Sequence, residues 1–285
     1  EFEKQTGIKV QVSNYSSNEE LLAKLQAGAD VYDVIVPSDY MIQAMIELKL
    51  LLPIDAAKTP NRKLLLADVV GKKFDSTNLF SLPYDWGTTG IAYNREKVKT
   101  PIRGWKDVWG NAAIAGKYSL LDDSRETIGD ALKSLGKSLN TQAPEDLNAA
   151  RALLLKHKNG VKAYTSEPMA ELVSGELWLA HAYMSDALQA KKETSGKIEY
   201  VIPEEGATLW IDNLAIPAKA KNVEEAHAFI NFLLDAKSNR ETVMEIMVSL
   251  ANCEVYALLP EEYQKNPNLF PDKNLMGKLE MMENL

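Results

Sequence analysis

The sequence has one cysteine, few histidines and none of the short motifs that mark many enzyme active sites. Cys253 is the only cysteine in 285 residues, which excludes an internal disulfide and a cysteine metal cluster. The three histidines, His157, His181 and His227, lack the spacing of a helical metal pair or a zinc-protease motif. No GxGxxG, GxxxxGKS, GxxxxGKT or GxSxG occurs, so nothing supports nucleotide binding and nothing points to a serine nucleophile.

Long apolar runs and an excess of positive charge are also missing. No stretch approaches the roughly 18 apolar residues of a membrane span. The net charge of −8 argues against nucleic acid and anionic membrane surfaces as partners, and it favours cationic ones. The chain opens on "EFEKQTGIKV", which reads like the last turn of a helix running into a strand. We therefore expect that the natural chain starts earlier and that any export signal stands there.

Alternating strand and helix patterns run along the chain. Strands are expected at 8–14, 32–38, 118–123, 177–184 and 198–203, with a strand pair within 80–94. Helices are expected at 17–28, 39–49, 124–135, 144–157, 185–193, 222–235 and 238–250, and a terminal helix is expected to end at Leu285. This order predicts an α/β fold with mostly parallel sheets, and the length predicts two lobes. No low-complexity linker separates them, which favours a hinge of short crossing segments.

Acidic and aromatic residues recur where a strand is expected to end and a helix to begin. In open α/β sheets, ligands bind beyond the carboxyl ends of the strands, so these residues are candidates for one site. Carboxylates pair with ammonium groups, and aromatic faces cover methylenes and attract cations. The pattern therefore predicts an organic-cation site. The residues concerned lie in "VPSDY" (Ser38, Asp39, Tyr40), "PYDWG" (Tyr84, Asp85, Trp86), "LLDDSRE" (Asp122, Asp123, Glu126, with Arg125), "AHAYMSD" (Tyr183, Ser185, Asp186) and "LWIDN" (Trp210, Asp212).

The stretch "TLWIDNLAIP" carries the sharpest signal. Trp210 and Asp212 are two apart in an expected strand that ends at Pro217, so both should point to the same face. A core has no use for the carboxylate, and a solvent face has little use for the indole. A cleft that holds an alkyl ammonium suits both.

The carboxylates also have structural interpretations. Asp123 and Glu126 fit the start of a helix, with an N-cap and a Glu that reaches back from the third position. Asp39 and Asp186 can be helix caps. For these residues, capping and ligand contact both remain open.

The aromatic residues divide in a similar way. Tyr84 and Trp86 fit a core as well as a site, because most aromatic side chains are buried. Trp105 and Trp109 lie on one helix face and are interpreted as core. The methionine-rich tail "LMGKLEMMENL" is interpreted as packing.

Four stretches in order, "YDVIVPSDYM", "SLPYDWGTTGIAYN", "LLDDSRETIGDAL" and "LWIDNLAIPAKAKN", closely resemble the bacterial polyamine-binding proteins. These are the spermidine/putrescine substrate-binding components of ABC importers, and the resemblance covers nearly the whole chain. It implies two α/β lobes of the periplasmic-binding-protein type that close by a hinge onto a ligand. One lobe would comprise 1–87 with 210–248, and the other 88–209 with 249–285.

The resemblance also implies a role for each matching residue. Ser38 and Tyr40 would meet the ligand, with Asp39 between them. Asp123 and Glu126 would bind an amino end from the other lobe. Trp210 would stack on the aliphatic chain, and Asp212 would bind an ammonium. Tyr183 stands where the family commonly has Trp, and Trp86 matches the family's "WG" near the hinge.

The sequence departs from the family pattern at three places. The family begins with a strand that carries an "NW" motif, and this chain starts after it. Val248 stands where the family usually has a site Tyr, which removes a ring and a hydroxyl. Asp39 stands where some members have a neutral residue. These changes leave open which amine fits.

The resulting prediction is a monomeric binding protein, not an enzyme, that delivers a polyamine to a membrane permease. It would need no cofactor and no metal, would not bind nucleic acid, and would lie in the periplasm or be lipid-anchored outside the cytoplasmic membrane. The alternatives are a glycoside-hydrolase-like enzyme that uses the same carboxylates, a receptor for another organic cation or a sugar, and a surface or sensor protein without transport function.

Overall fold

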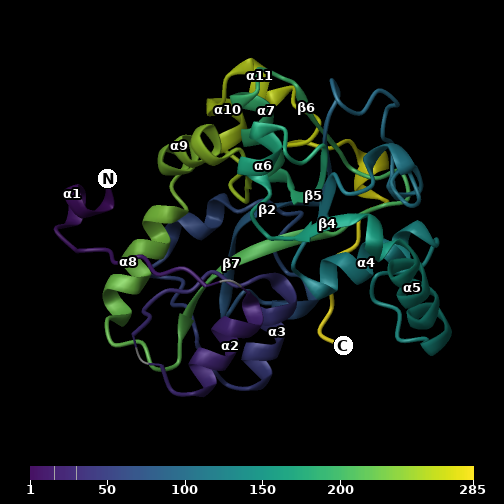
Figure 1. The fold of residues 1–285 in the computed structure, drawn as a ribbon. Coiled ribbons are helices and arrows are strands. Elements are labelled where there is room, and N and C mark those ends of the chain that lie inside the picture. Colours follow the sequence, from purple (N-terminus) through teal and green to yellow (C-terminus); the bar gives the residue numbers. More distant parts are fainter. Residues whose placement is uncertain (16, 30) are drawn as a thin grey trace.

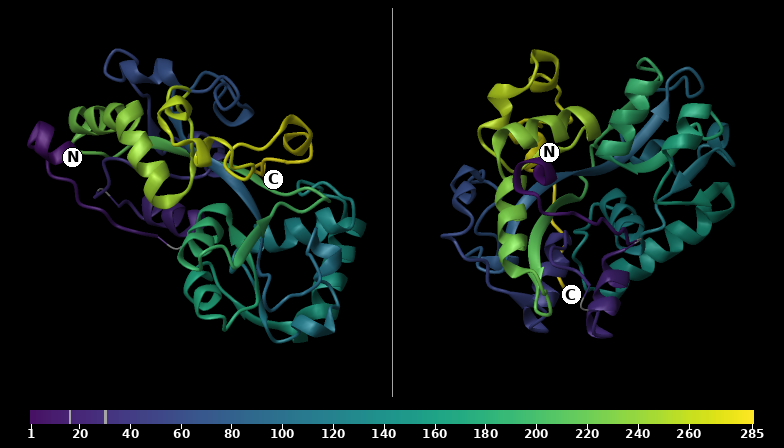
Figure 2. Two further views of the ribbon diagram at one scale, coloured as in Figure 1. Left: turned by 90° about the horizontal axis from the view of Figure 1, so that it is seen from above. Right: turned by 90° about the vertical axis from the view of Figure 1, so that its left-hand side faces the viewer.

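The molecule forms two lobes that share one pair of long strands. The computed structural model describes residues 1–15, 17–29 and 31–285. Strand β2 (Ser81–Asn94) pairs with β7 (Leu209–Pro217) through its first half and with β5 (Leu179–Tyr183) through its second half. Figure 1 shows β2 and β7 crossing the middle of the molecule, and Figure 2 shows the teal lobe separate from the purple, green and yellow one.

The sheet is mixed, and the prediction of mostly parallel sheets was wrong. Besides β2, β5 and β7, the strands are β1 (Leu51–Leu52), β3 (Tyr118–Leu120), β4 (Val161–Tyr164), β6 (Ile198–Val201) and β8 (Ser249–Leu250). The strand order is β1-β7-β2-β5-β3-β4, with β6 and β8 also on β2. Among the strands of the described residues, β3 alone pairs in parallel, with β4 and β5. The chain leaves one lobe along β2 and returns along β7, so these two strands must run in opposite directions.

The expected strand pair within 80–94 is a single strand. Gly87 and Gly90 both lie inside β2. A Cβ at Gly87 would lie 2.4 Å from the Trp210 ring, and one at Gly90 would lie 2.5 Å from the Val201 carbonyl oxygen. These glycines therefore admit close neighbours and do not reverse the chain.

The first two expected strands are not strands. Residues 8–14 have no strand pairing in the part of the chain that the structure describes, and Val12 is 81% exposed. Residues 32–38 lie along β7 but form only the isolated bridges Ile35–Ala215 and Ser38–Asp212. Pro37 accepts a hydrogen bond from Asn213 N (2.9 Å) but has no N–H to return one, which interrupts the ladder.

The expected helices are confirmed to within a few residues, apart from the terminal one. The last helix is α12 (Lys273–Met276), and Glu280 beyond it pairs with Thr208 as an isolated parallel bridge. The other helices are α1 (Phe2–Thr6), α2 (Asn18–Gln26), α3 (Asp39–Glu47), α4 (Ser124–Ser134), α5 (Pro144–His157), α6 (Met169–Ser174), α7 (Met184–Glu193), α8 (Val223–Leu233), α9 (Ala236–Ile246), α10 (Val255–Leu258) and α11 (Glu261–Gln264), with short 3-10 turns η1 (Pro60–Leu64), η2 (Lys73–Asp75), η3 (Trp105–Asp107), η4 (Ala112–Ile114) and η5 (Lys158–Gly160).

The core consists of several apolar clusters on the two sides of the sheet. Trp105 is fully buried and stacks on Trp109 with ring centroids 5.0 Å apart, which confirms the core interpretation of this pair. Met41 and Met45 of α3 are buried in the cluster of the first lobe. Among the helices of the described residues, none combines the length and apolarity that a bilayer crossing requires.

Candidate binding site

A cavity of about 470 Å³ lies beside β7 and is reached by side chains from both lobes. It collects the predicted site residues Ser38, Asp39, Tyr40, Asp123, Glu126, Tyr183, Trp210 and Asp212. It is also lined by Tyr15, Ser17, Asn18, Val36, Asp85, Ser185, Asp186, Gln189, Thr208, Ile246, Val248 and Met282.

Strand β7 places Trp210 and Asp212 on the cavity side, as the alternation of the strand predicted. Gly87 is the register partner of Trp210 on β2, and the missing side chain leaves room for the indole. Tyr183 meets the indole edge-to-face, with ring centroids 6.4 Å apart and planes at 88°. The two rings together form an apolar wall of the cavity.

Asp212 is held by the segment ahead of α3. Ser38 Oγ donates to Asp212 Oδ1 over 2.6 Å, and Asn18 fixes Ser38 by donating to that hydroxyl and accepting from Ser38 N, both over 3.1 Å. Burial raises the pKa of Asp212 to about 6, and the Ser38 hydrogen bond opposes the rise. Ser38 therefore both orients the carboxylate and favours its charged form.

Asp85 was among the candidates from the strand ends, but the family resemblance gave it no role. It is the direct register partner of Asp212 across the β2–β7 pair, so the two carboxylates share one face. Burial raises the pKa of Asp85 well above its ordinary value, and the neighbouring Asp212 adds to the rise. The strand alternation could have indicated Asp85, because it lies opposite in phase to Tyr84 and Trp86.

Trp86 is the predicted site residue that the structure places elsewhere. It is buried in an apolar cluster with Val69, Ile211 and Ala251, and it does not line the cavity. Its cross-strand partner Ile211 likewise faces away from the cavity. Since Asp85 takes the cavity face of β2, the next residue must point to the opposite side.

The start of α4 contributes two carboxylates with different tasks. Asp123 is the N-cap and accepts from the amides of Arg125 (2.9 Å) and Glu126 (3.1 Å), as the capping interpretation predicted. Glu126 does not reach back to the cap. Its oxygens accept from the hydroxyls of Thr89 (3.0 Å) and Thr208 (2.8 Å), and burial raises its pKa well above the ordinary value.

Tyr40 is fixed between two charged groups. Its hydroxyl donates to Glu19 over 3.1 Å, and the Arg125 guanidinium carbon lies 4.4 Å from its ring centroid. Arg125 also donates to the carbonyl oxygen of Glu283. This arginine is therefore occupied outside the cavity and is absent from its lining.

Two residues interpreted as possible caps do not cap their helices through their side chains. Ser38 is the N-cap position of α3, and Asp39 begins the helix itself, accepting from Tyr40 N over 2.7 Å. Tyr183 is the N-cap position of α7, with Asp186 in its first turn and in the cavity lining. Burial raises the pKa of Asp39 and of Asp186, to about 8 and about 6 respectively.

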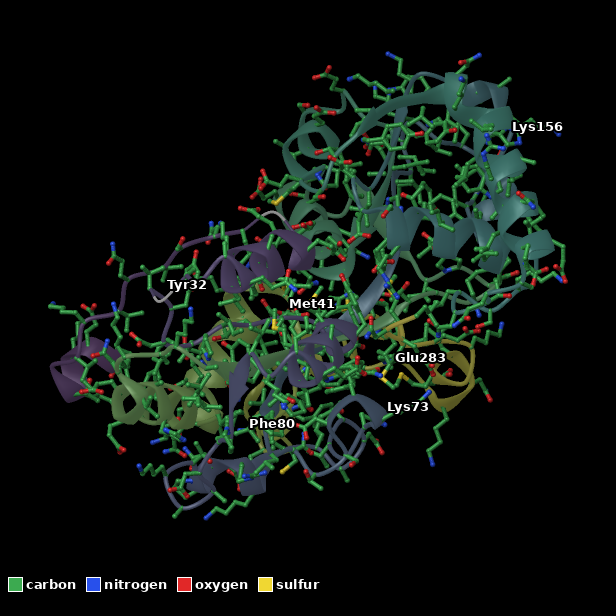
Figure 3. All side chains as sticks on the ribbon, turned by 90° about the horizontal axis from the view of Figure 1, so that it is seen from below. Tyr32, Met41, Lys73, Phe80, Lys156 and Glu283 are labelled. Atoms are coloured by element: carbon green, nitrogen blue, oxygen red, sulfur yellow. The ribbon has the colours of Figure 1, made fainter. Side chains whose placement is uncertain are left out.

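The C-terminal segment closes one side of the cavity. Met282 lines it and packs with Met41 and Met45, which confirms the packing interpretation of the methionine-rich tail. Glu283 forms an ion pair with Lys73 over 2.9 Å, and Figure 3 shows these two side chains next to each other.

The charge of the lining is of one sign. Six carboxylates face the cavity, and no Lys, Arg or His does so among the described residues. Tyr15, Tyr40, Tyr183 and Trp210 add aromatic surface. No group of three or more His, Cys, Asp or Glu in the described part of the chain is arranged to hold a metal ion. Chemically, this arrangement can bind an organic cation and cover its apolar part.

Several curated proteins are similar to this chain over most of its length. A spermidine/putrescine-binding periplasmic protein of Haemophilus influenzae is 38% identical over 280 residues, covering 97% of this chain and 77% of the relative. A putrescine/cadaverine-binding protein of Pseudomonas aeruginosa is 34% identical over 296 residues, covering 100% of this chain and 84% of the relative.

Solved structures of related proteins have the same fold as this chain. A Listeria monocytogenes structure assigned to a spermidine/putrescine ABC transporter superposes with a TM-score of 0.95 at 36% identity, covering 100% of this chain and 88% of that one. A spermidine/putrescine ABC transporter substrate-binding protein of Streptococcus pneumoniae gives a TM-score of 0.86 at 33% identity, with the same coverage. The expected two-lobed fold is confirmed. The family model of the bacterial extracellular solute-binding proteins matches residues 1–271, and the chain belongs to that family.

Proposed function

We propose that this protein captures a polyamine of the spermidine/putrescine class. The observation that carries the proposal is the cavity lining, where six carboxylates and four aromatic rings face one space with no cationic side chain among the described residues. An isolated buried charge is destabilised by several kcal/mol, so a cavity of this kind needs a ligand with more than one positive charge.

Each part of a polyamine has a counterpart in the cavity. Asp212 and Asp85 lie on the β2–β7 side, whereas Asp123 and Glu126 come from the start of α4. Carboxylates separated in this way match ammonium groups separated by methylenes. Trp210 and Tyr183 would cover the methylenes and exclude water from them.

We propose that the lobes close on the ligand where β2 and β7 cross between them, with 1–87 and 210–248 in one lobe and 88–209 in the other. The sequence-based expectation assigned 249–285 to the second lobe. We place this segment with the first lobe instead (Figure 2), because β8 pairs with β2 at Asp85 and Trp86 and Asn252 bridges to Leu65. The register supports a crossing near residues 87–89, because β2 changes partner from β7 to β5 there. A ligand that touches both lobes favours the closed state through its differential affinity. The closed monomer would then deliver the polyamine to an ABC permease outside the cytoplasmic membrane.

The family is one of solute-binding proteins, and we propose no catalytic role for the carboxylates. The net charge of −8 also supports a cationic small molecule and not a nucleic acid as the partner.

Titration calorimetry with putrescine and spermidine at low salt tests this function. We expect saturable binding of at least one of them, and no binding of glucose or maltose in the same buffer. The absence of heat with every polyamine tried, or thermal stabilisation by a sugar and not by a diamine, would overturn the proposal.

A further inference from the structure

Three carboxylates meet across one end of the cavity, and two of them are additional to Asp212. Asp85 is the register partner of Asp212 on one side of β7. On the other side, Ser38 is the bridge partner of Asp212, and Asp39 follows it directly. All three aspartates line the same cavity. We call Asp39, Asp85 and Asp212 the aspartate end.

Asp39 is the unusual member. Asp39 is only 1% exposed, and its Oδ1 accepts a hydrogen bond from Tyr40 N over 2.7 Å. The other oxygen, Oδ2, is buried and makes no hydrogen bond of full geometry among the described residues, although an interaction with the Ile211 backbone lowers the pKa of this carboxyl group. Asp85 also has a buried oxygen, Oδ1, without a partner there. Buried carboxylate oxygens are normally paired, so each of these two can accept a further hydrogen bond from a donor that reaches it.

The protein compensates the charge of Asp39 only in part: burial and the nearby Asp212 raise its pKa, and the backbone amides of Tyr40 and Ile211 and the Arg125 guanidinium oppose that rise incompletely. Asp39 begins α3, and a helix N-terminus stabilises an anion by about 0.3–1 kcal/mol. Burying an unpaired carboxylate costs several kcal/mol, and like charges directly opposite on paired strands repel. No cationic residue lines the cavity in the described chain, so the compensating charge must arrive with the ligand.

We propose that Asp39 and Asp85 join Asp212 in one ammonium site that selects a primary –NH₃⁺ end over an N-methylated end. This inference rests on the proposed polyamine function and identifies two residues that set its specificity. A primary ammonium has three N–H donors, and the aspartate end offers three carboxylates. Each N-methyl group removes one donor and leaves a carboxylate oxygen unpaired in a buried place.

The remaining carboxylates serve the far nitrogen. Asp123 and Glu126 lie at the start of α4, and Asp186 lies in the first turn of α7. A diamine with one methylated end could reverse its direction in the cavity. A symmetrical ligand pair therefore gives the clearest measurement, namely putrescine and N,N,N′,N′-tetramethylputrescine.

The test is the ratio of the two dissociation constants, tetramethylputrescine over putrescine, measured by calorimetry for four proteins. These are the wild type, Asp39→Asn, Asp85→Asn and the control Asp68→Asn, which removes the same charge at an exposed position outside the cavity. We expect each of the first two variants to weaken putrescine binding at least tenfold and to lower the ratio at least threefold. Asp68→Asn should change neither value.

Thermal unfolding of each variant shows whether it is folded. If one aspartate variant fails to fold, the other decides. Folded Asp39→Asn and Asp85→Asn proteins that bind putrescine as the wild type does, or that lose affinity for both ligands in equal proportion, would overturn this inference and leave the polyamine function intact. Failure of the wild type to bind putrescine, spermidine or tetramethylputrescine would overturn both.

Discussion

At the residue scale, Glu126 shows how the protein orients a buried carboxylate in the cavity. Both of its oxygens accept hydroxyl hydrogen bonds, from Thr89 on β2 and from Thr208 just ahead of β7. These neutral donors orient the carboxylate without neutralising it. Burial still raises its pKa, so the full stabilisation of the charged form requires a cation.

Replacing Glu126 with Gln removes that charge and keeps the shape. We expect the dissociation constant for putrescine to rise at least tenfold, or about 1.4 kcal/mol, because a charge-assisted pair is lost. The free energy of unfolding without ligand should stay the same or rise, since a buried carboxylate no longer has to be accommodated. Calorimetry and urea unfolding measure the two quantities.

Glu145→Gln is the matched control. Glu145 also lies in the first turn of a helix, α5, but it is exposed and outside the cavity. Equal affinities for the Glu126 variant and this control would remove Glu126 from the site.

Ser38→Ala tests the hydrogen bond that supports Asp212, because it leaves the Asp212 carboxylate itself in place. The hydrogen bond from Ser38 lowers the pKa of Asp212. Because Ser38→Ala removes this bond, the pKa of Asp212 should rise. Polyamine affinity should fall by about twofold to tenfold, matching a hydrogen bond of about 0.5–1.5 kcal/mol. The loss should be larger at pH 6 than at pH 8, because the charged form is scarcer at pH 6. Calorimetry at both pH values checks this, and an equal loss at both would refute the role given to Ser38.

At the scale of the elements, β2 and β7 act as one unit. Their register places Gly87 opposite Trp210 and Asp85 opposite Asp212. The glycine gives the indole its place, and the paired aspartates give the cavity its charge. A substitution on β2 should therefore change polyamine binding by moving a side chain on β7.

Gly87→Ala makes this coupling measurable. The new Cβ would lie 2.4 Å from Trp210 Cζ2, so the indole must move. We expect polyamine affinity to fall at least tenfold with the protein still folded, because stacking on an alkyl chain depends on the ring position. Tryptophan fluorescence on titration with putrescine should also change in amplitude.

Gly129→Ala serves as the comparison. Gly129 lies within α4, and a Cβ there meets only Leu139 Cβ at an ordinary 3.4 Å. This substitution should raise the free energy of unfolding by about 0.5–1 kcal/mol and leave the affinity unchanged. If Gly87→Ala behaved in the same way, the indole position would not matter for binding.

At the scale of the whole molecule, the cavity makes stability and binding depend on pH in opposite directions. Burial raises the pKa of Asp39 to about 8, and those of Asp186 and Asp212 to about 6. An unfolded aspartate has a pKa of about 3.9, so the folded protein keeps protons that the unfolded chain has already lost. Stability without ligand must then fall as pH rises from about 4 to about 8.

Polyamine affinity should rise over the same interval, because the ligand binds the ionised carboxylates. We expect a higher free energy of unfolding at pH 5 than at pH 8 without ligand, and a dissociation constant at least tenfold lower at pH 8 than at pH 5. Urea unfolding and calorimetry at both values measure this. Asp39→Asn should reduce both slopes. A stability that increased from pH 5 to pH 8 would contradict the burial of these carboxylates.

Much of the fold could be predicted because its signals are local. The N-cap residue Ser17 predicts the start of α2 at Asn18, and the N-cap residue Asp123 predicts the start of α4. The course of 80–94 could not be predicted in this way. Whether a glycine turns the chain or admits a neighbour depends on Trp210 and Val201, which are distant in sequence.

The features of the site likewise divide into those with local signals and those that depend on residues distant in sequence. By itself, the sequence determined the chemistry of the cavity, because acidic and aromatic residues at strand ends already indicate an organic cation. Alternation in one strand also determined that Trp210 and Asp212 share a face. The tertiary structure alone decided that Asp85 and not Trp86 lines the cavity, and that one buried oxygen of Asp39 makes no hydrogen bond of full geometry among the described residues. The reason is physical: the number of carboxylates that meet at one point depends on register between strands far apart in the chain.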